Sequence, residues 1–510
     1  MKLLFAQAYH LKFDPKLWAA MQPYPPLATL IAAAIARRAG HHVRLVDSLF
    51  CDTDNAWNAA LQKQQPDMVV LYEDNFNYLS KMCLLNMRDA AARMTAQAKS
   101  YGAQVIVCSS DATDHPELYF AQGADFILLG EGDATLEELL RALRREPSSH
   151  LNDILGLAWK DRQGKIVKNK SRPVICDLDT LPGPAWDLLD FEAYRAIWRR
   201  HHGYYSINLV TSRGCPYQCN WCAKPLWGRH YNAHSPEQVV NEMLHLQNTV
   251  KPDHIWFMDD IFGLKPGWLS EFAQLLQREN LKIPFKCLSR PDLLQRNGDI
   301  EALALAGCRQ VWIGAESGSQ KILTAMTKQT SVSDIRCASE KLKNAGIEVG
   351  HFIQFGYLGE TWRDIMLTLK MLRSVKPDYL GISVSYPLPG TLFHDRVKEQ
   401  LGQKQNWRHS DDLAMLYQSP FGTKFYRCLH KLTHADLYVR KCCTWRDWAG
   451  RWRAPVHFIR HLAGLFYNVA LLSLLWPQLW LLRFQSQTDG NWPGTSKSSA
   501  QAPDPLRERE

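Results

Sequence analysis

Short apolar segments alternate with helix-forming segments along most of this chain, and this alternation restricts the fold more than any other feature. Within residues 1–146, the strand-like runs KLLFAQA, PDMVVLYE and AQVIVCSS are separated by Ala/Leu-rich or amphipathic stretches. Parallel strands need a crossover between them, which is usually a helix. We therefore predict an α/β fold that begins with a doubly wound, Rossmann-like parallel sheet. Ligands of such sheets bind at the carboxyl ends of the strands.

A second series of the same kind covers residues 206–395. Its six strand-like runs are SINLVTS, HIWFMDD, FKCLSR, QVWIGAES, EVGHFIQFG and YLGISVSYP, with helix-forming segments between them. Six units predict a partial TIM-like (β/α) barrel, whose functional residues would lie where the strands end. Residues 147–205 connect the two series and contain a predicted hairpin, GLAWKDRQGKIVKNKS, followed by a Pro-punctuated linker.

The composition narrows the class of protein. The chain has 510 residues, a formal charge of +9 and 46% hydrophobic residues, which excludes a wholly disordered or fibrous protein. Lys12 and Asp14 interrupt any apolar run near the start, so no signal peptide is expected. Thirteen cysteines in 510 residues are too sparse for a disulfide scaffold, and the expected location is the cytoplasm.

The predicted C-terminal region, residues 396–484, is basic and rich in tryptophan. Residues 440–460 contain six Lys/Arg and one acid, and no charged residue occurs within 462–482. A basic, Trp-rich flank beside an apolar helix predicts contact with the inner face of a membrane, lying in the interface rather than crossing it. The alternative is a buried helical cap over the barrel mouth. No nucleic-acid partner is expected, and residues 485–510 are predicted to be disordered.

One motif is chemically specific. The sequence SRGCPYQCNWC places Cys215, Cys219 and Cys222 in a CxxxCxxC spacing directly after the first barrel strand. Three thiolates this close together can bind one soft metal centre and leave one coordination position open. The alternative is a structural zinc ion, which needs a fourth ligand, and His230 or His234 would have to supply it.

The cysteine motif resembles the cluster loop of radical S-adenosylmethionine (SAM) enzymes. In that family three cysteines bind a 4Fe-4S cluster whose open iron chelates SAM, and an electron cleaves SAM to a deoxyadenosyl radical. The resemblance covers roughly residues 1–450 and extends to the subfamily with an N-terminal cobalamin-binding domain. That subfamily includes radical methyltransferases and the anaerobic magnesium-protoporphyrin ester cyclase. The other motifs that carry it are FMDDIFG (257–263), CLSRPDLL (287–294), GAESGSQ (314–320), FIQFGYLGET (352–361) and SYPLPGT (385–391).

The resemblance implies a SAM site at the ends of the barrel strands. Arg290 would pair with the SAM carboxylate, and Glu316 would accept hydrogen bonds from the ribose or amino group. The alternative is that Arg290 and Glu316 form an ion pair within the barrel. Asp259 and Asp260 would be a proton or substrate site, or else a helix N-cap. The remaining SAM contacts that the resemblance implies are Trp221, Gly314, Ser317 and Gly356.

Residues 1–146 resemble a cobalamin-binding module, although the DxHxxG signature of modules that supply a histidine to cobalt is absent. His10 and His115 are candidates by residue type alone. Either cobalamin binds without a histidine ligand, or the domain has lost cobalamin. A methylthiotransferase would place a second cluster on Cys51, Cys83 and Cys108, but buried bystander cysteines are the better account. The loop residues that the resemblance assigns to cobalamin are Ser109, Ser110, Thr113, Gly130, Glu131 and Gly132.

The resemblance implies an enzyme that transfers a methyl group to an unactivated carbon of a hydrophobic or lipid-like small molecule. Its cofactors would be a 4Fe-4S cluster, SAM and cobalamin, with an electron donor such as a flavodoxin or ferredoxin. One alternative is a radical oxidative cyclase that acts on a pigment or lipid-like substrate. A second, of another class, is a non-catalytic iron–sulfur or corrinoid carrier. No further catalytic residue is assigned from the sequence.

Overall fold

The computed structural model divides the chain into two compact units, Met1–Gln418 and Ser419–Glu510. Each unit is described by itself below. The residues that the structure describes are 1–50, 53–76, 84–145, 151–222, 227–401, 413–442 and 455–485.

The first sheet of the larger unit has seven strands in the order β2-β1-β3-β4-β5-β6-β7. The first five are parallel to one another, as predicted. The predicted hairpin is also present, and it extends this sheet because β6 pairs antiparallel with β5. The strands are β1 (Lys2–Ala6), β2 (His42–Val46), β3 (Met68–Tyr72), β4 (Gln104–Cys108), β5 (Phe126–Leu128), β6 (Leu157–Lys160) and β7 (Ile166–Lys168).

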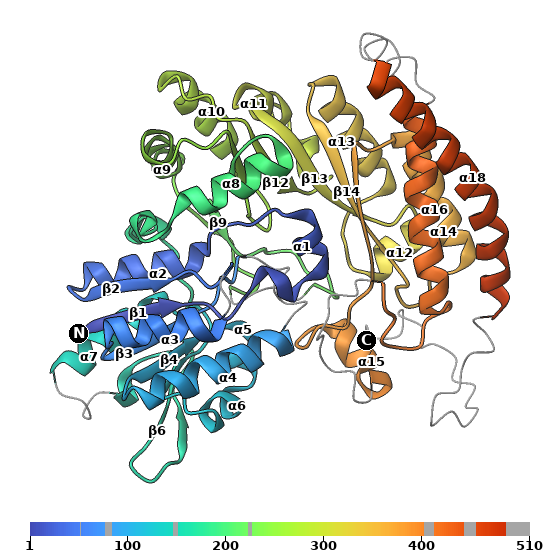
Figure 1. The fold of residues 1–510 in the computed structure, drawn as a ribbon. Coiled ribbons are helices and arrows are strands. Elements are labelled where there is room, and N and C mark those ends of the chain that lie inside the picture. The colour runs from blue at the N-terminus through green and yellow to red at the C-terminus, as the bar shows by residue number, and fades with distance from the viewer. Residues whose placement is uncertain are drawn as a thin grey trace, which may run out of the picture. The chain divides into compact units, whose positions relative to one another are not determined.

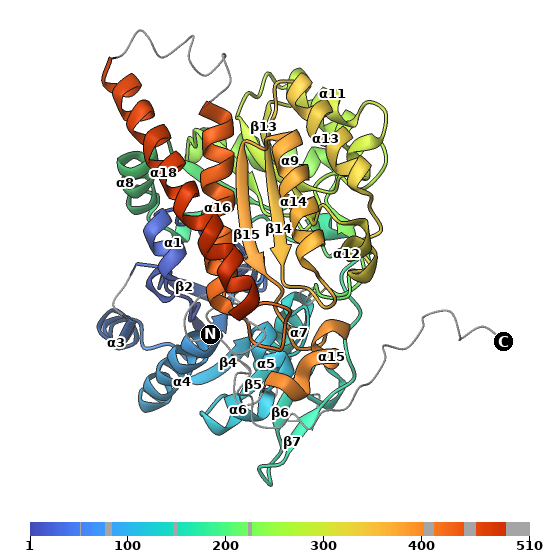
Figure 2. The same cartoon turned by 90° about the vertical axis from the view of Figure 1, so that its right-hand side faces the viewer.

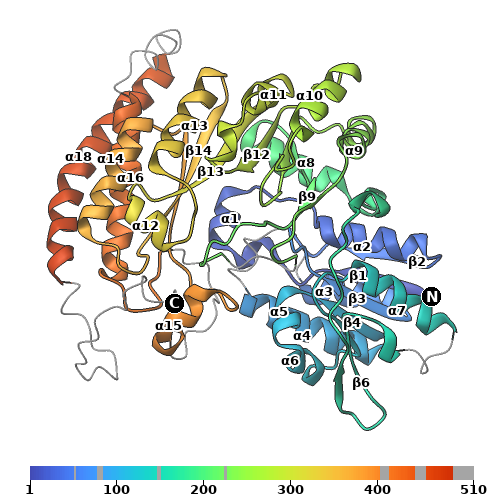
Figure 3. The same ribbon diagram turned by 180° about the vertical axis from the view of Figure 1, so that it is seen from behind.

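Helices cover both faces of the first sheet (Figures 1 and 3). Helix α2 packs beside α7, and α3 packs beside α4. The strands between them are buried on both faces, which explains why they read as continuous apolar runs. The helices are α1 (Pro15–Ala20), α2 (Leu27–Arg38), α3 (Thr53–Gln64), α4 (Leu84–Ser100), α5 (Ser110–Asp114), α6 (Pro116–Ala121) and α7 (Asp133–Arg145).

The second sheet of the larger unit confirms the six predicted barrel strands. All six are parallel and follow one another in chain order, and within the described residues the first and last strands are not paired with each other. The sheet is therefore a curled half-barrel, which Figure 2 shows from the side of its last strands. The strands are β8 (Ser206–Leu209), β11 (His254–Phe257), β12 (Phe285–Ser289), β13 (Cys308–Glu316), β14 (Glu348–Phe355) and β15 (Tyr379–Val384).

Helices that follow the half-barrel strands complete this part of the unit. Two of them begin with reciprocal capping boxes, at Ser331 with Asp334 and at Thr361 with Asp364, as their sequences favour. The helices are α8 (Phe191–His202), α9 (Pro236–Thr249), α10 (Trp268–Arg278), α11 (Asp299–Leu305), α12 (Gln320–Ala325), α13 (Val332–Asn344), α14 (Trp362–Val375) and α15 (Leu392–Leu401). A two-stranded ribbon is formed by β9 (Ser212–Arg213) and β10 (Asn232–Ala233). Short 3₁₀ helices cover Leu11–Phe13, Leu151–Asp153, Leu178–Thr180, Trp186–Leu188 and Leu293–Gln295.

Glycines inside the half-barrel strands make room for an aromatic stack. The rings of Trp312 and Phe352 lie 4.6 Å apart and nearly parallel. A Cβ at Gly350 would stand 2.3 Å from the Trp312 ring, because these two residues are register partners on adjacent strands. Gly350 therefore leaves the room that the Trp312 ring occupies on the neighbouring strand.

The smaller unit contains two long helices, α16 (Thr423–Cys442) and α18 (Pro455–Gln485), which pack against each other. Residues Leu462–Phe484 of α18 are long and apolar enough to cross a membrane by length and composition alone. The large apolar side chains that α18 exposes are Phe466, Tyr467, Val469, Leu474, Trp480, Leu481 and Phe484.

Candidate functional site

The three cysteines lie on a loop that leaves the half-barrel directly after β9. Gly214 begins this loop with a left-handed φ of +83°, and a Cβ there would stand 2.3 Å from the carbonyl oxygen of His230. Cys215, Cys219 and Cys222 are half-buried, and none of the three forms a disulfide. The strand thus turns sharply at a position that only glycine fits, and the turn carries the cysteines to the carboxyl edge of the sheet.

Asp259, at the end of β11, holds the segment that leads into this loop. Its Oδ1 accepts hydrogen bonds from the backbone N–H and the hydroxyl of Thr211 and from the hydroxyl of Ser212. Burial raises the pKa of Asp259 to about 7. The alternative that Asp259 caps a helix is wrong, because the helix that follows has Gly267 at its N-cap.

The cysteine loop offers three thiols to a metal centre, whereas His234 is engaged elsewhere and does not serve as a fourth ligand. Burial, and to a smaller extent nearby Asp260, Cys219 and Cys215, together raise the pKa of the Cys222 thiol to about 12. The raised pKa means that thiolate charges are unfavourable in this loop, and a metal centre that binds the thiolates would offset that free-energy cost. His234, offered above as a zinc ligand, instead pairs with Asp179 at 2.9 Å. In the described part of the chain, no three His, Cys, Asp or Glu side chains are gathered as a site for a single metal ion.

Arg290 lies against this loop but is heavily engaged. Its Nε pairs with Asp292 at 3.0 Å, its Nη2 donates to the carbonyl oxygen of Lys328 at 2.7 Å, and its Nη1 lies 3.9 Å from the Sγ of Cys219. The guanidinium also stacks on the ring of Tyr217, 3.6 Å from its centroid. The structure thus places Arg290 at the cluster loop, although the two-pronged face expected for a SAM carboxylate is already occupied.

Glu316 has a different partner from the one considered in the sequence. Its Oε1 accepts a hydrogen bond from the Nζ of Lys328 at 2.8 Å, so the alternative of an Arg290–Glu316 ion pair is wrong. A Cβ at Gly314 would stand 2.5 Å from that Nζ, and the glycine therefore makes room for the pair. Lys328 also lies 6.0 Å from the ring centroid of Trp221, which is half-buried. Sequence reasoning missed Lys328, because nothing in its local sequence distinguishes it from a surface lysine.

Ser317 and Gly356 end adjacent half-barrel strands in different ways. Ser317 is fully buried, and its hydroxyl bonds to Thr368 and to the N–H of Ser319, so its side chain serves the turn into α12 rather than an open site. Gly356 adopts a left-handed φ of +79°. Its N–H donates to Glu360 at 2.6 Å, and its carbonyl accepts the Tyr417 hydroxyl. These two bonds hold the backbone where the resemblance places the SAM adenine.

The carboxyl of Glu360 should make stability depend on pH. Its pKa is raised from 4.5 to about 8, chiefly by burial and also by Asp364, while the hydrogen bond from the N–H of Gly356 and the charge of Lys321 oppose the rise. Because the folded state holds this proton more tightly, the stabilisation is complete below pH 4.5 and is lost as the pH rises through about 8. We expect the melting temperature of the wild type to fall more than that of Glu360→Gln between about pH 5 and about pH 9. Parallel melting curves from scanning fluorimetry would contradict this assignment.

The segment around Ser109 is helical, not the loop expected from the sequence. Ser109 caps α5 by accepting a hydrogen bond from the N–H of Ala112 at 2.9 Å, and Ser110 is the first residue of that helix. The Thr113 hydroxyl accepts from the N–H of Gly130 at 3.1 Å. The expectation of a loop was wrong because a serine N-cap and a proline at the start of the next helix favour helix over loop.

The turn of Gly130, Glu131 and Gly132 lies at the same edge of the first sheet. Gly130 has a left-handed φ of +72° and open space where a Cβ would be. A Cβ at Gly132 would stand 2.5 Å from the Sγ of Cys108, so this glycine allows the turn to pack on the ends of the strands. Glu131 is buried and faces Arg213 of the half-barrel, which was not foreseen.

Two buried polar atoms face the carboxyl edge of the first sheet without a hydrogen-bond partner in the described part of the chain. They are the Oε1 of Gln7, directly after β1, and the Oε2 of Glu73, directly after β3. Burial raises the pKa of Glu73 to about 8, so its carboxyl is largely protonated at neutral pH. Buried polar atoms are normally satisfied. Their position is therefore one where a polar ligand would complete the hydrogen bonding.

The other candidate ligands of this region are placed as follows. His10 is fully buried and packs edge-on against Phe13, and His115 lies between α5 and α6. Cys108 is buried at the end of β4. Cys51 and Cys83 lie outside the described residues.

A hollow lies where the two sheets approach each other. It is bounded by the residues that follow β3, by the cysteine loop and by the end of β11. The hollow has a volume of only about 10 Å³, and it marks the place where the cluster loop meets the carboxyl edge of the first sheet. The residues that line this hollow are Asn75, Phe76, Ser212, Gly214, Trp227, Met258 and Asp260.

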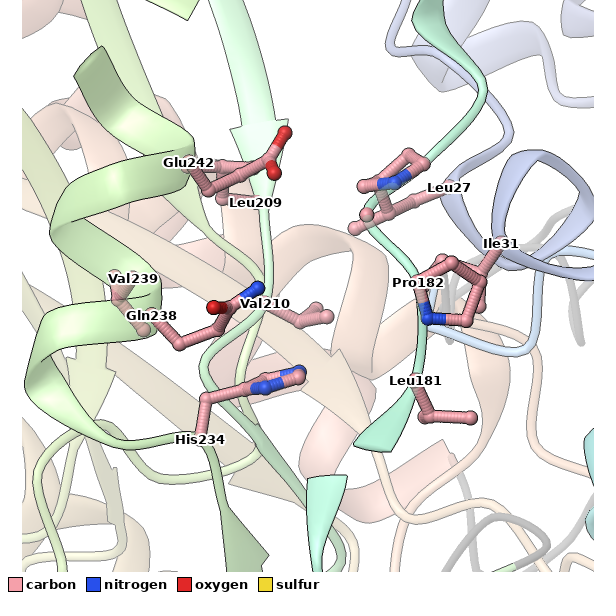
Figure 4. Close-up of a pocket in the computed structure, with 12 residues that line it drawn as sticks. Leu27, Ile31, Leu181, Pro182, Leu209, Val210, His234, Gln238, Val239 and Glu242 are labelled. Atoms are coloured by element: carbon pink, nitrogen blue, oxygen red, sulfur yellow. The ribbon is translucent and has the colours of Figure 1, made fainter. Parts of the chain in front are cut away.

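Figure 4 shows another pocket, between α2, the segment 181–184 and α9. It is mainly apolar, and Leu27 and Ile31 face Val239 across it. Two of its polar groups are already engaged, since His234 pairs with Asp179 and Glu242 accepts a hydrogen bond from the indole of Trp186. We therefore assign this pocket to packing between the two parts of the unit.

The comparisons with known proteins agree with this geometry. Residues 209–372 match the family model described as the radical SAM superfamily. An uncharacterized methyltransferase of Pyrococcus horikoshii is 30% identical over 397 residues, which cover 75% of this chain and 81% of that protein. The chain belongs to the radical SAM superfamily. As a radical SAM enzyme it uses SAM and a 4Fe-4S cluster, which Cys215, Cys219 and Cys222 would hold.

Other radical SAM relatives differ in the reaction that their names state. An anaerobic magnesium-protoporphyrin IX monomethyl ester cyclase of Synechocystis is 27% identical, and the match covers 63% of each protein. The hopanoid C-3 methylase of Methylococcus capsulatus is 25% identical over 72% of this chain and 67% of that protein. The chain therefore spans less than two thirds of the cyclase but four fifths of the Pyrococcus methyltransferase.

A solved structure shares the fold of this radical SAM enzyme. OxsB, a cobalamin-dependent SAM radical enzyme with aqua-cobalamin and SAM bound, superposes with a TM-score of 0.66 at 18% identity. The match covers 91% of this chain and 72% of OxsB. The expected α/β architecture, a parallel sheet followed by a half-barrel, is thereby confirmed.

Proposed function

We propose that this protein is a cobalamin-dependent radical SAM methyltransferase that methylates an unactivated carbon of a hydrophobic substrate. The observation that carries the proposal is that the cysteine loop and the carboxyl edge of the first sheet meet at one small hollow. A methyl carrier bound at that edge and a radical generated at the cysteine loop would both act on a substrate bound at this junction. Relatives named as methyltransferases support the reaction type.

The bound cofactors would supply an electron that cleaves SAM to a deoxyadenosyl radical, and a cobalt centre that carries the methyl group. The protein's own residues would bind and orient these cofactors. Lys328 and Glu316 offer a buried charge pair beside the cysteine loop, and Gly356 presents a backbone that is held on both sides. At the first sheet, Gln7 and Glu73 would complete their hydrogen bonds with polar groups of the corrinoid.

The lining of the hollow supports a hydrophobic substrate. Phe76 and Trp227 stack with their ring centroids 4.9 Å apart, and Met258 lies beside them. Aromatic and thioether side chains at this junction suit an apolar molecule. Asp260 and Asn75 would provide the few polar contacts that orient it.

The experiment uses the full-length protein, purified without oxygen, reconstituted with iron and sulfide, and loaded with hydroxocobalamin. With dithionite and SAM carrying a labelled methyl group, we expect both 5′-deoxyadenosine and corrinoid-dependent S-adenosylhomocysteine. Deoxyadenosine without S-adenosylhomocysteine would favour the oxidative cyclase instead, which the Synechocystis relative makes the second candidate. A preparation that cannot retain hydroxocobalamin would contradict the proposed cobalamin dependence. A flavodoxin or ferredoxin would replace dithionite in the cell.

We further propose that α18 brings the enzyme to the cytoplasmic face of a membrane. Its exposed side chains include Phe466, Leu474 and Trp480, and the flanking sequence 440–460 is basic. Apolar and aromatic groups next to Lys and Arg favour the interface of an anionic bilayer. Co-sedimentation with phosphatidylglycerol vesicles should fall when Phe466 and Leu474 are replaced by aspartate. If the wild type stays in solution with these vesicles, the proposal is wrong.

A further inference from the structure

Arg213 lies two residues before the first cluster cysteine and is buried in a three-membered ion cluster. Its Nη1 lies 2.5 Å from the Oε1 of Glu131 and 2.7 Å from the Oδ2 of Asp133. All three side chains are almost fully buried, at 4%, 4% and 6% exposure. The arginine is the last residue of β9, Glu131 comes from the turn that the resemblance assigns to cobalamin, and Asp133 begins α7 directly after that turn.

Both carboxylate oxygens of Glu131 are engaged. Oε1 accepts from Arg213, and Oε2 accepts from the N–H of Ile175 at 2.6 Å. A side chain that is buried and bonded on both oxygens does not face the edge where a corrinoid would lie. Gly130, by contrast, has open space where a Cβ would be. The sequence-based assignment of the Glu131 side chain to cobalamin therefore does not fit the geometry.

The same ion cluster fixes the start of the cysteine loop. The guanidinium of Arg213 lies over the rings of Phe76 and Trp227, 5.5 Å and 6.0 Å from their centroids. Glu131 and Asp133 hold it from the first sheet, and these contacts fix the residue that leads through Gly214 into Cys215. Hydrogen bonds to charged groups are about twice as strong as neutral ones and are sensitive to geometry.

We infer that Glu131 is a positioning residue for the iron–sulfur cluster, acting through Arg213, and not a contact of the corrinoid. The inference rests on the proposed function in one respect: the cofactor that Glu131 does not contact is taken to be a corrinoid. It predicts that the turn at residues 130–133 has two separable tasks. Its backbone faces the bound corrinoid, and its carboxylates orient the cluster loop.

The test compares wild type with Glu131→Gln, which keeps the shape and the acceptor for Ile175 but removes the charge facing Arg213. In Glu131→Gln, the affinity for SAM should fall about tenfold, as a loss of 1.4 kcal/mol would produce. The electron paramagnetic resonance spectrum of the reduced cluster should also respond less to added SAM. The dissociation constant for hydroxocobalamin, measured by ultrafiltration, should stay within about twofold of wild type, since 0.4 kcal/mol is a change of that size.

The matched control is Glu138→Gln. Glu138 lies in α7, the helix that follows the Glu131 turn, and pairs with Arg172, which does not lead to the cluster loop, so this variant should match wild type in every measurement. If Glu131→Gln fails to fold by circular dichroism, Asp133→Asn removes the other carboxylate from the same guanidinium and should give the same result.

The outcomes separate the two proposals. Weaker hydroxocobalamin binding in Glu131→Gln, with or without a normal cluster, would overturn the inference. An unchanged cluster response to SAM would also overturn it. Failure of the wild type to bind hydroxocobalamin would refute only the cobalamin part of the proposed function, because the cluster measurements would still decide the role of Glu131.

Discussion

Replacing Cys219 by alanine is expected to remove the brown absorbance of the iron–sulfur cluster and all cleavage of SAM. Three thiolates would hold three irons, and two cannot keep the fourth iron open and correctly placed. The side chain of Cys219 is half-buried in a loop, so its loss should leave the protein folded and soluble. Anaerobic reconstitution followed by iron analysis and chromatography of 5′-deoxyadenosine measures both effects.

The matched control for this substitution is Cys337→Ala. Cys337 is also half-buried, but it lies in α13 and outside the CxxxCxxC motif. This variant should bind as much iron as the wild type and cleave SAM at the same rate. Turnover retained in Cys219→Ala would contradict the proposed mechanism, and iron lost equally from both variants would show that the measurement reports general damage.

Replacing Gly214 by alanine is expected to lower both stability and cluster content. An L-residue in the left-handed region costs roughly 1–2 kcal/mol. The added Cβ would also stand 2.3 Å from the carbonyl oxygen of His230, which is backbone and cannot rotate away. We expect a loss of at least about 2 kcal/mol in the free energy of unfolding, since the conformational strain and the clash add. Iron bound per chain should fall with it, because the displaced residue is next to Cys215.

The control Gly203→Ala separates the conformational strain from the clash with the carbonyl oxygen. Gly203 has nearly the same φ, +79°, but nothing lies within 4 Å of where its Cβ would be. This control should lose only the conformational cost, about 1 kcal/mol, and should keep a full cluster. Urea unfolding and iron analysis of both variants give the comparison. Equal losses of stability in the two variants would mean that the loop relaxes around the carbonyl oxygen.

Much of the fold could be predicted because its signals are local. The strand β3 is apolar throughout, and the helix α9 begins with Ser235 as its N-cap, so both are recognisable from neighbouring residues alone. The half-barrel strands were also recognisable, because each ends at a motif of small or polar residues. The hairpin of β6 and β7 was recognised, but its place at the edge of the first sheet was not, since strand order depends on pairing between distant segments.

The candidate site was predictable only where function depends on spacing along the chain. Three cysteines within eight residues can be recognised as a metal-binding motif from the sequence alone. The partners of charged residues cannot be recognised in the same way. The sequence offered Arg290 and Glu316 as an ion pair, but Glu316 pairs with Lys328 and Arg290 pairs with Asp292. A lysine that looks ordinary in the sequence, Lys328, becomes a buried member of the site only after folding.

The sequence by itself determined the alternation of strands and helices, the cysteine loop and the membership of the superfamily, because each depends on residues close together in the chain. Only the tertiary structure decided that Glu131 faces Arg213 across 82 positions of sequence. Charge pairing inside a protein depends on which groups are buried together, and burial is set by the packing of whole sheets rather than by neighbours along the chain.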